Sequence, residues 1–449
     1  MNITDSFLEE IFETFEKEIP EHVLEKAKIS LLDYLAVTLA GTTSFSEYID
    51  KYLEVTDPEP GICTAIGLKR NMNLKEAAFL NGLNGHALDF DDGTNTGIIH
   101  LGSPIFSVLL PLAQKYKVEP NLFWEAVVIG YEVSFTMAIS IQPQHKELGY
   151  HATGTCGILG IVIAAAHMLK LSKDITKNAF SIACVSSTGM LKVLDDGSEL
   201  KPYNVAKTAL LGVTALQMAQ AGFKGHPDPL GGARGFLKMM TGNENTELKH
   251  TLFKGTYAIE KTYTKPYAAC RYCHPAIEAT IRISEKYQLQ LENISSIDVS
   301  TYYWAVKKHD HTKIHGSASA KMSIPYGVAV GLLYGKAGLK EYSDEMVSSS
   351  NILELTSKVS VTDDPKLTKK FPEVTTAIVN IHMLSGECYT EQVDFPKGEP
   401  ENPMTEKEFL TRFTDLCLYG GKNEQEISGI WELIHSRSMD MKRLFEYIR

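Results

Sequence analysis

Ionisable side chains are concentrated between residues 86 and 104. The segment HALDFDDGTNTGIIHLGSP holds two histidines and three aspartates, directly after an apolar segment with helical spacing. Such groups beside buried surface are costly unless they pair with one another or bind a ligand. Asp89 and Asp91 flank Phe90, so one carboxylate can face a pocket while the other makes a local contact. The alternative interpretation is an acidic turn that ends the helix at Asp92-Gly93.

Two other segments carry candidate groups for an anionic ligand. GYHATGTCGILG (149–160) places His151 at the start of a predicted helix, where backbone N–H groups and the helix dipole favour a carboxylate. A histidine that caps the helix or lies in the core is equally consistent with this position. Lys201 precedes Pro202, the usual first residue of a helix. Because a cation there opposes the dipole, it needs exposure to solvent or a compensating anion.

The segment KPYAACRYCHPAIEA (265–279) also suits recognition of a carboxylate. The planar guanidinium of Arg271 can grip a carboxylate with two hydrogen bonds, and His274 lies three residues later. Cys270 and Cys273 are spaced as CxxC, but no second pair at zinc spacing accompanies them, so core thiols are the expected interpretation. Three histidines between residues 309 and 315 lack a completing carboxylate or cysteine and are typical of a polar loop. The sequence therefore predicts no metal site.

Composition restricts the class of protein. The chain has 449 residues, a formal net charge of −11 and 44% hydrophobic residues, with no basic stripe, which argues against a nucleic-acid partner. Seven scattered cysteines are typical of reduced thiols. The N-terminus has no signal-peptide pattern, and the apolar run at 157–168 is too short to span a membrane. We expect a soluble cytoplasmic protein with no membrane partner.

The periodicity of apolar residues predicts a mainly α protein with a smaller α+β domain. Helical patterns dominate the first 255 residues, at 74–88, 103–116, 121–140, 154–170, 174–191 and 202–221. Strand-like alternation follows at 295–306, 357–364 and 375–395, the last as a hairpin around Ser385-Gly386. We therefore expect an all-helical domain over 1–260 and 400–449, with the α+β domain over 261–399.

The order of the motifs resembles a known family. HALDFDDG followed by a histidine, GYHATGTCG, KPYNVAKTALLG, KPYAACRYCHPAIEA, AKMSIPY and NPMT succeed one another as in the MmgE/PrpD family, over roughly residues 5–415. That family includes 2-methylcitrate dehydratases, cis-aconitate decarboxylases and iminodisuccinate epimerases. The resemblance implies a large helical domain, a smaller α+β lid, a homodimer, and catalysis without a metal or organic cofactor.

The family's site residues carry over where the motifs match. The catalytic positions implied by the resemblance are Asp89, His100, His151, Lys201 and His274. The expected substrate-binding positions are Arg271, Tyr326, Thr94 and Tyr150. Three departures from the family pattern bear on substrate identity: Gly93 replaces a threonine, His100-Leu101-Gly102-Ser103 replaces an HPS motif, and Asn204 replaces a histidine.

These residues suit chemistry at a carbon next to a carboxylate. Lysine, arginine and histidine donors can stabilise an enediolate-like charge while a histidine moves a proton, with Asp89 orienting that histidine. The leading hypothesis is dehydration of a 2-methylcitrate-like tricarboxylate. The alternatives are decarboxylation of a cis-aconitate type, or an epimerisation in which Tyr150 or His151 acts opposite Lys201. A different class also stays open, a non-catalytic carboxylate-binding member of the family.

Overall fold

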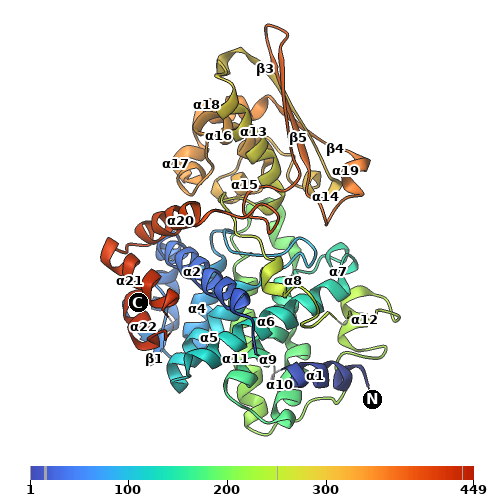
Figure 1. Ribbon diagram of the computed structural model, residues 1–449, viewed down its shortest axis with the longest axis vertical. Coiled ribbons are helices and arrows are strands. Elements are labelled where there is room, and N and C mark those ends of the chain that lie inside the picture. The colour runs from blue at the N-terminus through green and yellow to red at the C-terminus, as the bar shows by residue number, and fades with distance from the viewer. Residues whose placement is uncertain (1, 15–17, 250, 437) are drawn as a thin grey trace. The chain divides into compact units, whose positions relative to one another are not determined.

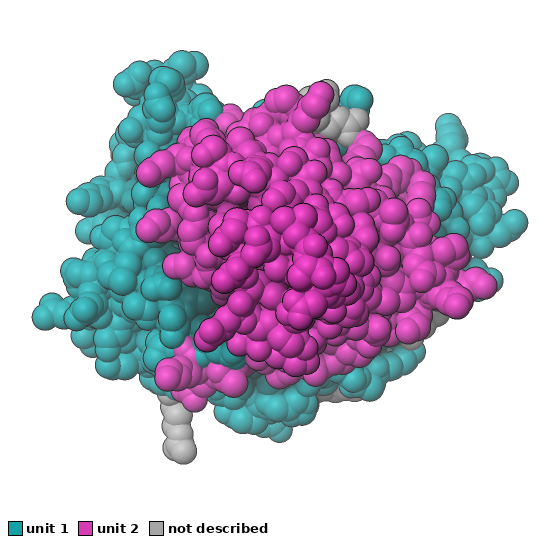
Figure 2. Space-filling view, turned by 90° about the horizontal axis from the view of Figure 1, so that it is seen from above, with its two compact units in different colours: residues 1–192, 200–262, 408–449 teal, residues 193–199, 263–407 magenta. Residues whose placement is uncertain are grey.

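The chain divides into two compact units, which we describe separately. The computed structural model describes residues 2–14, 18–249, 251–436 and 438–449, with the backbone alone at 195–197. Unit 1 comprises Met1–Lys192, Leu200–Thr262 and Glu408–Arg449, and unit 2 comprises Val193–Glu199 and Tyr263–Lys407 (Figure 2).

Helices form almost all the regular structure of unit 1 (Figure 1). They are α1 (Ile3–Thr14), α2 (Glu21–Ser44), α3 (Ser46–Thr56), α4 (Leu74–His86), α5 (Gly102–Tyr116), α6 (Pro120–Ile141), α7 (Gln144–Glu147), α8 (Ala152–Thr155), α9 (Gly157–Met168), α10 (Lys173–Ser186), α11 (Tyr203–Gln220), α12 (Phe236–Thr241), α20 (Glu406–Tyr419, from Glu408 on), α21 (Glu424–His435) and α22 (Met441–Ile448). A short antiparallel ribbon, β1 (Pro60–Thr64) with β2 (Asn71–Met72), was not expected from the sequence.

Small residues let the central helices of unit 1 approach closely. Helix α9 packs against α6, and α11 packs against α4, α9 and α10. A side chain at Gly160 of α9 would place its Cβ 2.0 Å from the Ser134 hydroxyl oxygen of α6, so only glycine fits. On α4, Gly82 similarly faces the backbone of Ala206 in α11. This close packing fixes the relation of α4 to α11, and both helices lead into candidate site residues.

Helix α6 is long and apolar enough to cross a membrane by length and composition alone. However, 89% of its most apolar window is buried inside the structure. A helix buried in a protein core passes the same test. Helix α6 is such a helix, because it packs against α2, α5 and α9.

Unit 2 combines a four-stranded mixed sheet with helices. Its helices are α13 (His274–Lys286), α14 (Tyr303–Val306), α15 (Ser317–Lys321), α16 (Ile324–Tyr334), α17 (Asp344–Val347), α18 (Ser350–Ser357) and α19 (Pro365–Thr368). Its strands are β3 (Ile294–Thr301), β4 (Val359–Asp363), β5 (Ala377–Met383) and β6 (Cys388–Val393), in the order β4-β3-β5-β6. Strands β3 and β4 are parallel and the other pairs antiparallel. The buried residues of β5 alternate along the strand, and α13 packs against β5 and β6.

The observed architecture confirms the predicted fold class, and two further local differences accompany the β1–β2 ribbon. The strand expected over 295–306 ends at Thr301, where its last register partners are Ala377 and Asp363. Because no strand continues beyond these partners, residues 303–306 form helix α14 instead. The helix expected over 154–170 is divided at Cys156 into α8 and α9.

Candidate active site

The loop between α4 and α5 holds three buried aspartates, Asp89, Asp91 and Asp92. Asp89 has a left-handed backbone (φ 51°), a conformation that aspartate tolerates better than most residues. Asp92 accepts hydrogen bonds from the Gly102 N–H at 2.8 Å and from the Tyr131 hydroxyl at 2.7 Å, which tie the loop to α5 and α6. Burial raises the pKa of Asp92 to about 6, although these two donors oppose the shift. Asp92 therefore fixes the loop.

Asp91 is the centre of a polar network, whereas the sequence suggested a structural residue. It accepts from His86 Nδ1 at 2.9 Å and from the Ser103 hydroxyl at 2.7 Å. His100 Nδ1 lies 3.3 Å from the same carboxylate, while His100 Nε2 lies 3.8 Å from Asp89. Burial alone raises the pKa of Asp91, but the charges of His100 and His86 outweigh it and hold the pKa well below its usual range. The expected orienting role of Asp89 therefore fits Asp91 better.

Lys201 pairs with Asp89, its Nζ lying 2.5 Å from Oδ1. Both side chains are largely buried, at 13% and 8% exposure. The sequence left open whether this cation, next to the N-terminus of α11, is exposed or paired with an anion. Its anion is Asp89, which the close packing of α11 on α4 brings within reach. A cation and a carboxylate thus share one small buried region with His100.

Three imidazoles complete this region. The His86 ring lies 4.6 Å from the His100 ring and 5.8 Å from the His151 ring, centroid to centroid. His151 occupies the N-cap position of α8 without a capping bond from its side chain, and its backbone N–H donates to the Gly189 carbonyl. Burial lowers the pKa of His86 to about 4, and burial with the neighbouring positive charges holds the pKa of His151 well below its usual value. His86 and His151 are therefore neutral near pH 7, and His86 Nδ1–H is a donor to Asp91.

The structure thus brings together Asp89, His100, His151 and Lys201 from three separate motifs. It adds two residues that the sequence did not select, His86 and Asp91. The signal for His86 was its place at the end of the apolar helix, four residues before Phe90 in the same motif. Both residues are buried, which distinguishes them from the residues of an ordinary acidic turn. The sequence did not reveal this burial.

The same cluster bears on the prediction of no metal. Donor atoms of His86, Asp89, Asp91 and His100 lie within 4.8 Å of one another, close enough to hold one ion. The Lys201 ammonium on Asp89 would repel a second cation there, and His86 and Ser103 already donate to Asp91. The absence of a metal therefore stays a prediction.

Thr94 and Tyr150 make mainly local contacts. The Thr94 hydroxyl accepts a hydrogen bond from the Gly97 N–H at 3.1 Å. The Thr94 N–H donates to the Ile99 carbonyl and so closes the turn that contains both residues. Tyr150 is half-buried, and its ring stacks on His145 at 5.2 Å. Their expected substrate-binding roles stay predictions.

Arg271 is one of three predicted site residues that belong to unit 2. It is buried, forms an ion pair with Glu399 and lies over the Tyr263 ring at 4.8 Å. Its Nε and Nη1 atoms have no hydrogen-bond partner within the described part of the chain. Those two N–H positions retain the capacity to bind a carboxylate that the sequence suggested.

His274 and Tyr326 are the other two. His274 is fully buried at the first residue of α13, with Nε2 3.0 Å from the Ala269 carbonyl oxygen. The Tyr326 hydroxyl donates to the Glu341 carbonyl at 2.7 Å, and the side chain is fully buried. Because this bond already uses the hydroxyl proton, the contact favours a structural role over the expected substrate-binding role. Lys265, in the same motif as His274, is also buried, at 1% exposure.

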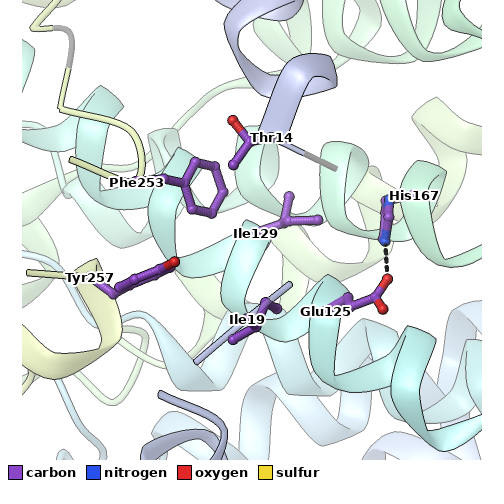
Figure 3. Close-up of a pocket in the computed structure, with 7 residues that line it drawn as sticks. All are labelled: Thr14, Ile19, Glu125, Ile129, His167, Phe253 and Tyr257. Carbon is purple, nitrogen blue, oxygen red and sulfur yellow. Dashed lines mark hydrogen bonds and ion pairs between the residues drawn. The ribbon is translucent and has the colours of Figure 1, made fainter. Parts of the chain in front are cut away.

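A hollow of about 280 Å³ in unit 1 is lined by a different set of side chains (Figure 3). They are Thr14, Ile19, Glu125, Ile129, His167, Phe253 and Tyr257. Its charged groups are Glu125 and His167, joined at 2.8 Å. The lining includes none of the predicted site residues, so the hollow is separate from the cluster around Asp91.

Two family models match most of the chain. The MmgE/PrpD N-terminal domain matches residues 11–249, and the MmgE/PrpD C-terminal domain matches residues 267–433. The chain belongs to the MmgE/PrpD family. It is 26% identical to the cis-aconitate decarboxylase-like protein oryM of Aspergillus oryzae, over 93% of this chain and 90% of the relative. It is 25% identical to cis-aconitate decarboxylase of Aspergillus terreus, over 96% and 92%. A 2-methylcitrate dehydratase of Salmonella typhimurium matches at 24%, over 56% and 55%.

Proposed function

We propose that this MmgE/PrpD-family enzyme decarboxylates an unsaturated tricarboxylate of the cis-aconitate type. The observation that carries the proposal is the Lys201–Asp89 pair beside His100 and Asp91, a buried cation next to an oriented imidazole. The relatives that extend over nine-tenths of both chains support decarboxylation, whereas the dehydratases align with little more than half. This preference replaces the dehydration that the sequence alone placed first.

The reaction shifts a double bond as CO₂ leaves. The bond between the CH₂ carbon of cis-aconitate and its carboxylate breaks, and its electron pair forms a new double bond to the central carbon. The electron pair of the old double bond takes up one proton at the far carbon. The balance is one tricarboxylate and one proton giving one dicarboxylate and CO₂. Negative charge builds at the far carbon and its carboxylate before the proton arrives, so a cation and a proton donor are needed there.

Lys201 and His100 fit these two needs. Lys201 supplies a buried positive charge that stabilises the enediolate-like carboxylate. His100 supplies the proton. Its Nδ1 lies beside Asp91, which orients the ring, and its Nε2 lies toward Asp89. His151 is less suited to donate, since burial keeps it neutral, and it would instead accept a hydrogen bond from the substrate. In unit 2, Arg271 retains two N–H positions that can bind a carboxylate.

Proton NMR in D₂O separates the candidate reactions. With cis-aconitate, decarboxylation gives CO₂ and a dicarboxylate that has a new methylene pair and one solvent deuterium on the carbon that was the far end of the old double bond. Epimerisation instead gives deuterium exchange at one carbon of a substrate whose stereoisomers interconvert. Line broadening without a product would identify a carboxylate-binding protein and contradict the proposal.

Matched lysine variants test the role of the cation. Lys201→Met should lower kcat by at least about 10²-fold, the usual loss when one charge-stabilising donor is removed. Lys207→Met is the control, because this lysine lies in α11, the helix that Lys201 precedes, and donates to the Thr188 hydroxyl outside the cluster. It should change kcat by less than about twofold, as for most surface substitutions. Equal losses in both variants would contradict the assignment.

Dehydration of a 2-methylcitrate-like hydroxy acid is the second candidate. It is supported by dehydratase relatives that align over 269 residues. The same cluster could remove the proton next to a carboxylate and protonate the leaving hydroxyl. Vinylic signals from 2-methylcitrate, with cis-aconitate unchanged, would establish this reading in place of decarboxylation.

A further inference from the structure

We propose that Arg412, on the C-terminal helix α20, positions the Asp89–Asp91 turn of the active site by holding Phe90. The inference rests on the proposed function for its kinetic meaning, but its geometry belongs to unit 1 alone. Arg412 lies outside every motif that the sequence analysis singled out. It reaches the turn from 322 residues away along the chain.

Arg412 holds Phe90 in two ways. Its Nη2 donates to the Phe90 carbonyl at 3.0 Å, and its guanidinium lies over the Phe90 ring, 4.4 Å from the centroid. Its Nη1 pairs with the Asp33 carboxylate on α2. All three side chains are less than 9% exposed, so solvent cannot replace these contacts.

The position of Phe90 determines where its two neighbours point. Asp89 bonds Lys201 on one side, and Asp91 bonds His86 and faces His100 on the other. The left-handed backbone of Asp89 requires surrounding contacts to hold it. A guanidinium fixed on both the ring and the carbonyl of Phe90 supplies such a contact. A shift of the turn by about 1 Å can cost 10²-fold in rate.

Stability alone does not account for this arrangement. A buried ion pair can often be replaced by uncharged groups without loss of stability. If uncharged residues replaced Arg412 and Asp33, the contacts of Arg412 with the ring and the carbonyl of Phe90 would be lost. Arg412 is therefore a positioning residue that acts through Phe90 on Asp89 and Asp91.

The test removes the charge pair together, so that no uncompensated carboxylate stays buried. In Arg412→Met/Asp33→Asn the fold should persist while kcat falls about 10²-fold, with a smaller change in KM. Asp33→Asn alone keeps both contacts to Phe90 and should lose much less. Arg443→Met, on the last helix α22 with its guanidinium bonded to the Tyr447 hydroxyl, is the control and should match the wild type. Arg412→Lys provides a second test should the double variant fail to fold, because a lysine cannot make both contacts.

A measurement without turnover separates this inference from the proposed function. The imidazole NMR signals of His100, assigned by their loss in His100→Asn, are compared in the ligand-free proteins at one pH. The chemical shifts of these signals should change in the double variant and in Arg412→Lys, but not in Arg443→Met. Unchanged kcat and unchanged His100 signals in a folded double variant would overturn the inference. If the wild type fails to decarboxylate cis-aconitate while the His100 signals still change, the proposed function fails and the positioning role stands.

Discussion

Arg412 in unit 1 and Arg271 in unit 2 have similar surroundings but differ in what they leave unused. Each is buried, each pairs with a carboxylate distant in sequence, and each lies over an aromatic ring. Arg412 gives its remaining terminal nitrogen to the Phe90 carbonyl and leaves only Nε without a partner in the described chain. Arg271 leaves both Nε and Nη1 without one. The first is suited to holding the protein's own backbone, and the second to binding a ligand carboxylate.

The largest expected effect is on substrate affinity at Arg271. Arg271→Met/Glu399→Gln removes the guanidinium without leaving a buried charge, and kcat/KM should fall about 10²–10³-fold, mainly through KM, as when a buried charged contact is lost. Steady-state kinetics with cis-aconitate measure this against Arg412→Met/Asp33→Asn, where the loss should lie in kcat. The same kinetic signature in both double variants would remove the distinction between the two arginines.

The next largest effect is on the free energy of unfolding, and it should be similar at Arg412 and at Arg271. Arg412→Met alone leaves Asp33 buried and uncompensated, and the free energy of unfolding should fall by about 3–5 kcal/mol. Adding Asp33→Asn to Arg412→Met should recover most of the lost stability. Adding Glu399→Gln to Arg271→Met should recover stability in the same way. Urea unfolding checks both pairs. If a double variant is no more stable than its arginine-to-methionine single variant, the loss of stability does not arise from the broken ion pair.

A buried carboxylate without an arginine provides the contrasting case. Glu132 on α6 accepts backbone N–H groups from Phe253 and Ala258, and burial raises its pKa to about 7. Between pH 4.5 and 7 the folded protein therefore binds more protons than the unfolded chain, and this group's contribution to stability falls as pH rises. The total change is of order 3 kcal/mol, from 1.36 kcal/mol for each pKa unit.

Glu132→Gln tests that sign directly. The variant should be less stable than the wild type at pH 5 and should lose less stability on going to pH 8. Thermal unfolding across this range measures the difference. A wild-type stability that rises more steeply with pH than that of Glu132→Gln would contradict the raised pKa.

The smallest expected effect is that of chelation. The cluster's own cation, Lys201, already lies on Asp89, so removal of divalent ions with EDTA should leave kcat within about twofold of its value before treatment. Activity that is lost with EDTA and restored by added Zn²⁺ would instead assign His86, Asp89, Asp91 and His100 as ligands.

Sequence reasoning recovered the elements and the principal charged residues because both are local signals. Apolar periodicity predicted α4, α5, α6 and α11, and alternation predicted the β5–β6 hairpin. The end of β3 at Thr301 was not predictable, because it depends on where its partner strands stop. Motif order indicated Asp89, His100, His151 and Lys201, which the fold brings into one cluster.

The sequence could not assign partners within that cluster. Lys201 was recognised as a cation in need of an anion, but only the packing of α11 on α4 identifies Asp89. Asp91 resembled a turn residue until its contacts with His86 and Ser103 were known. Arg412 lies in an ordinary amphipathic helix, and its contact with Phe90 spans the length of the chain. Such long-range contacts leave no local pattern.

We propose that the Lys201–Asp89–His100 cluster decarboxylates an unsaturated tricarboxylate. Proton NMR of cis-aconitate in D₂O, with the wild type and with Lys201→Met, together with detection of released CO₂, tests this most directly. We expect CO₂ in equal amount to a dicarboxylate with a new methylene pair and one deuterium, and loss of this product with Lys201→Met. Unchanged cis-aconitate with the wild type, or equal product from the variant, would contradict it.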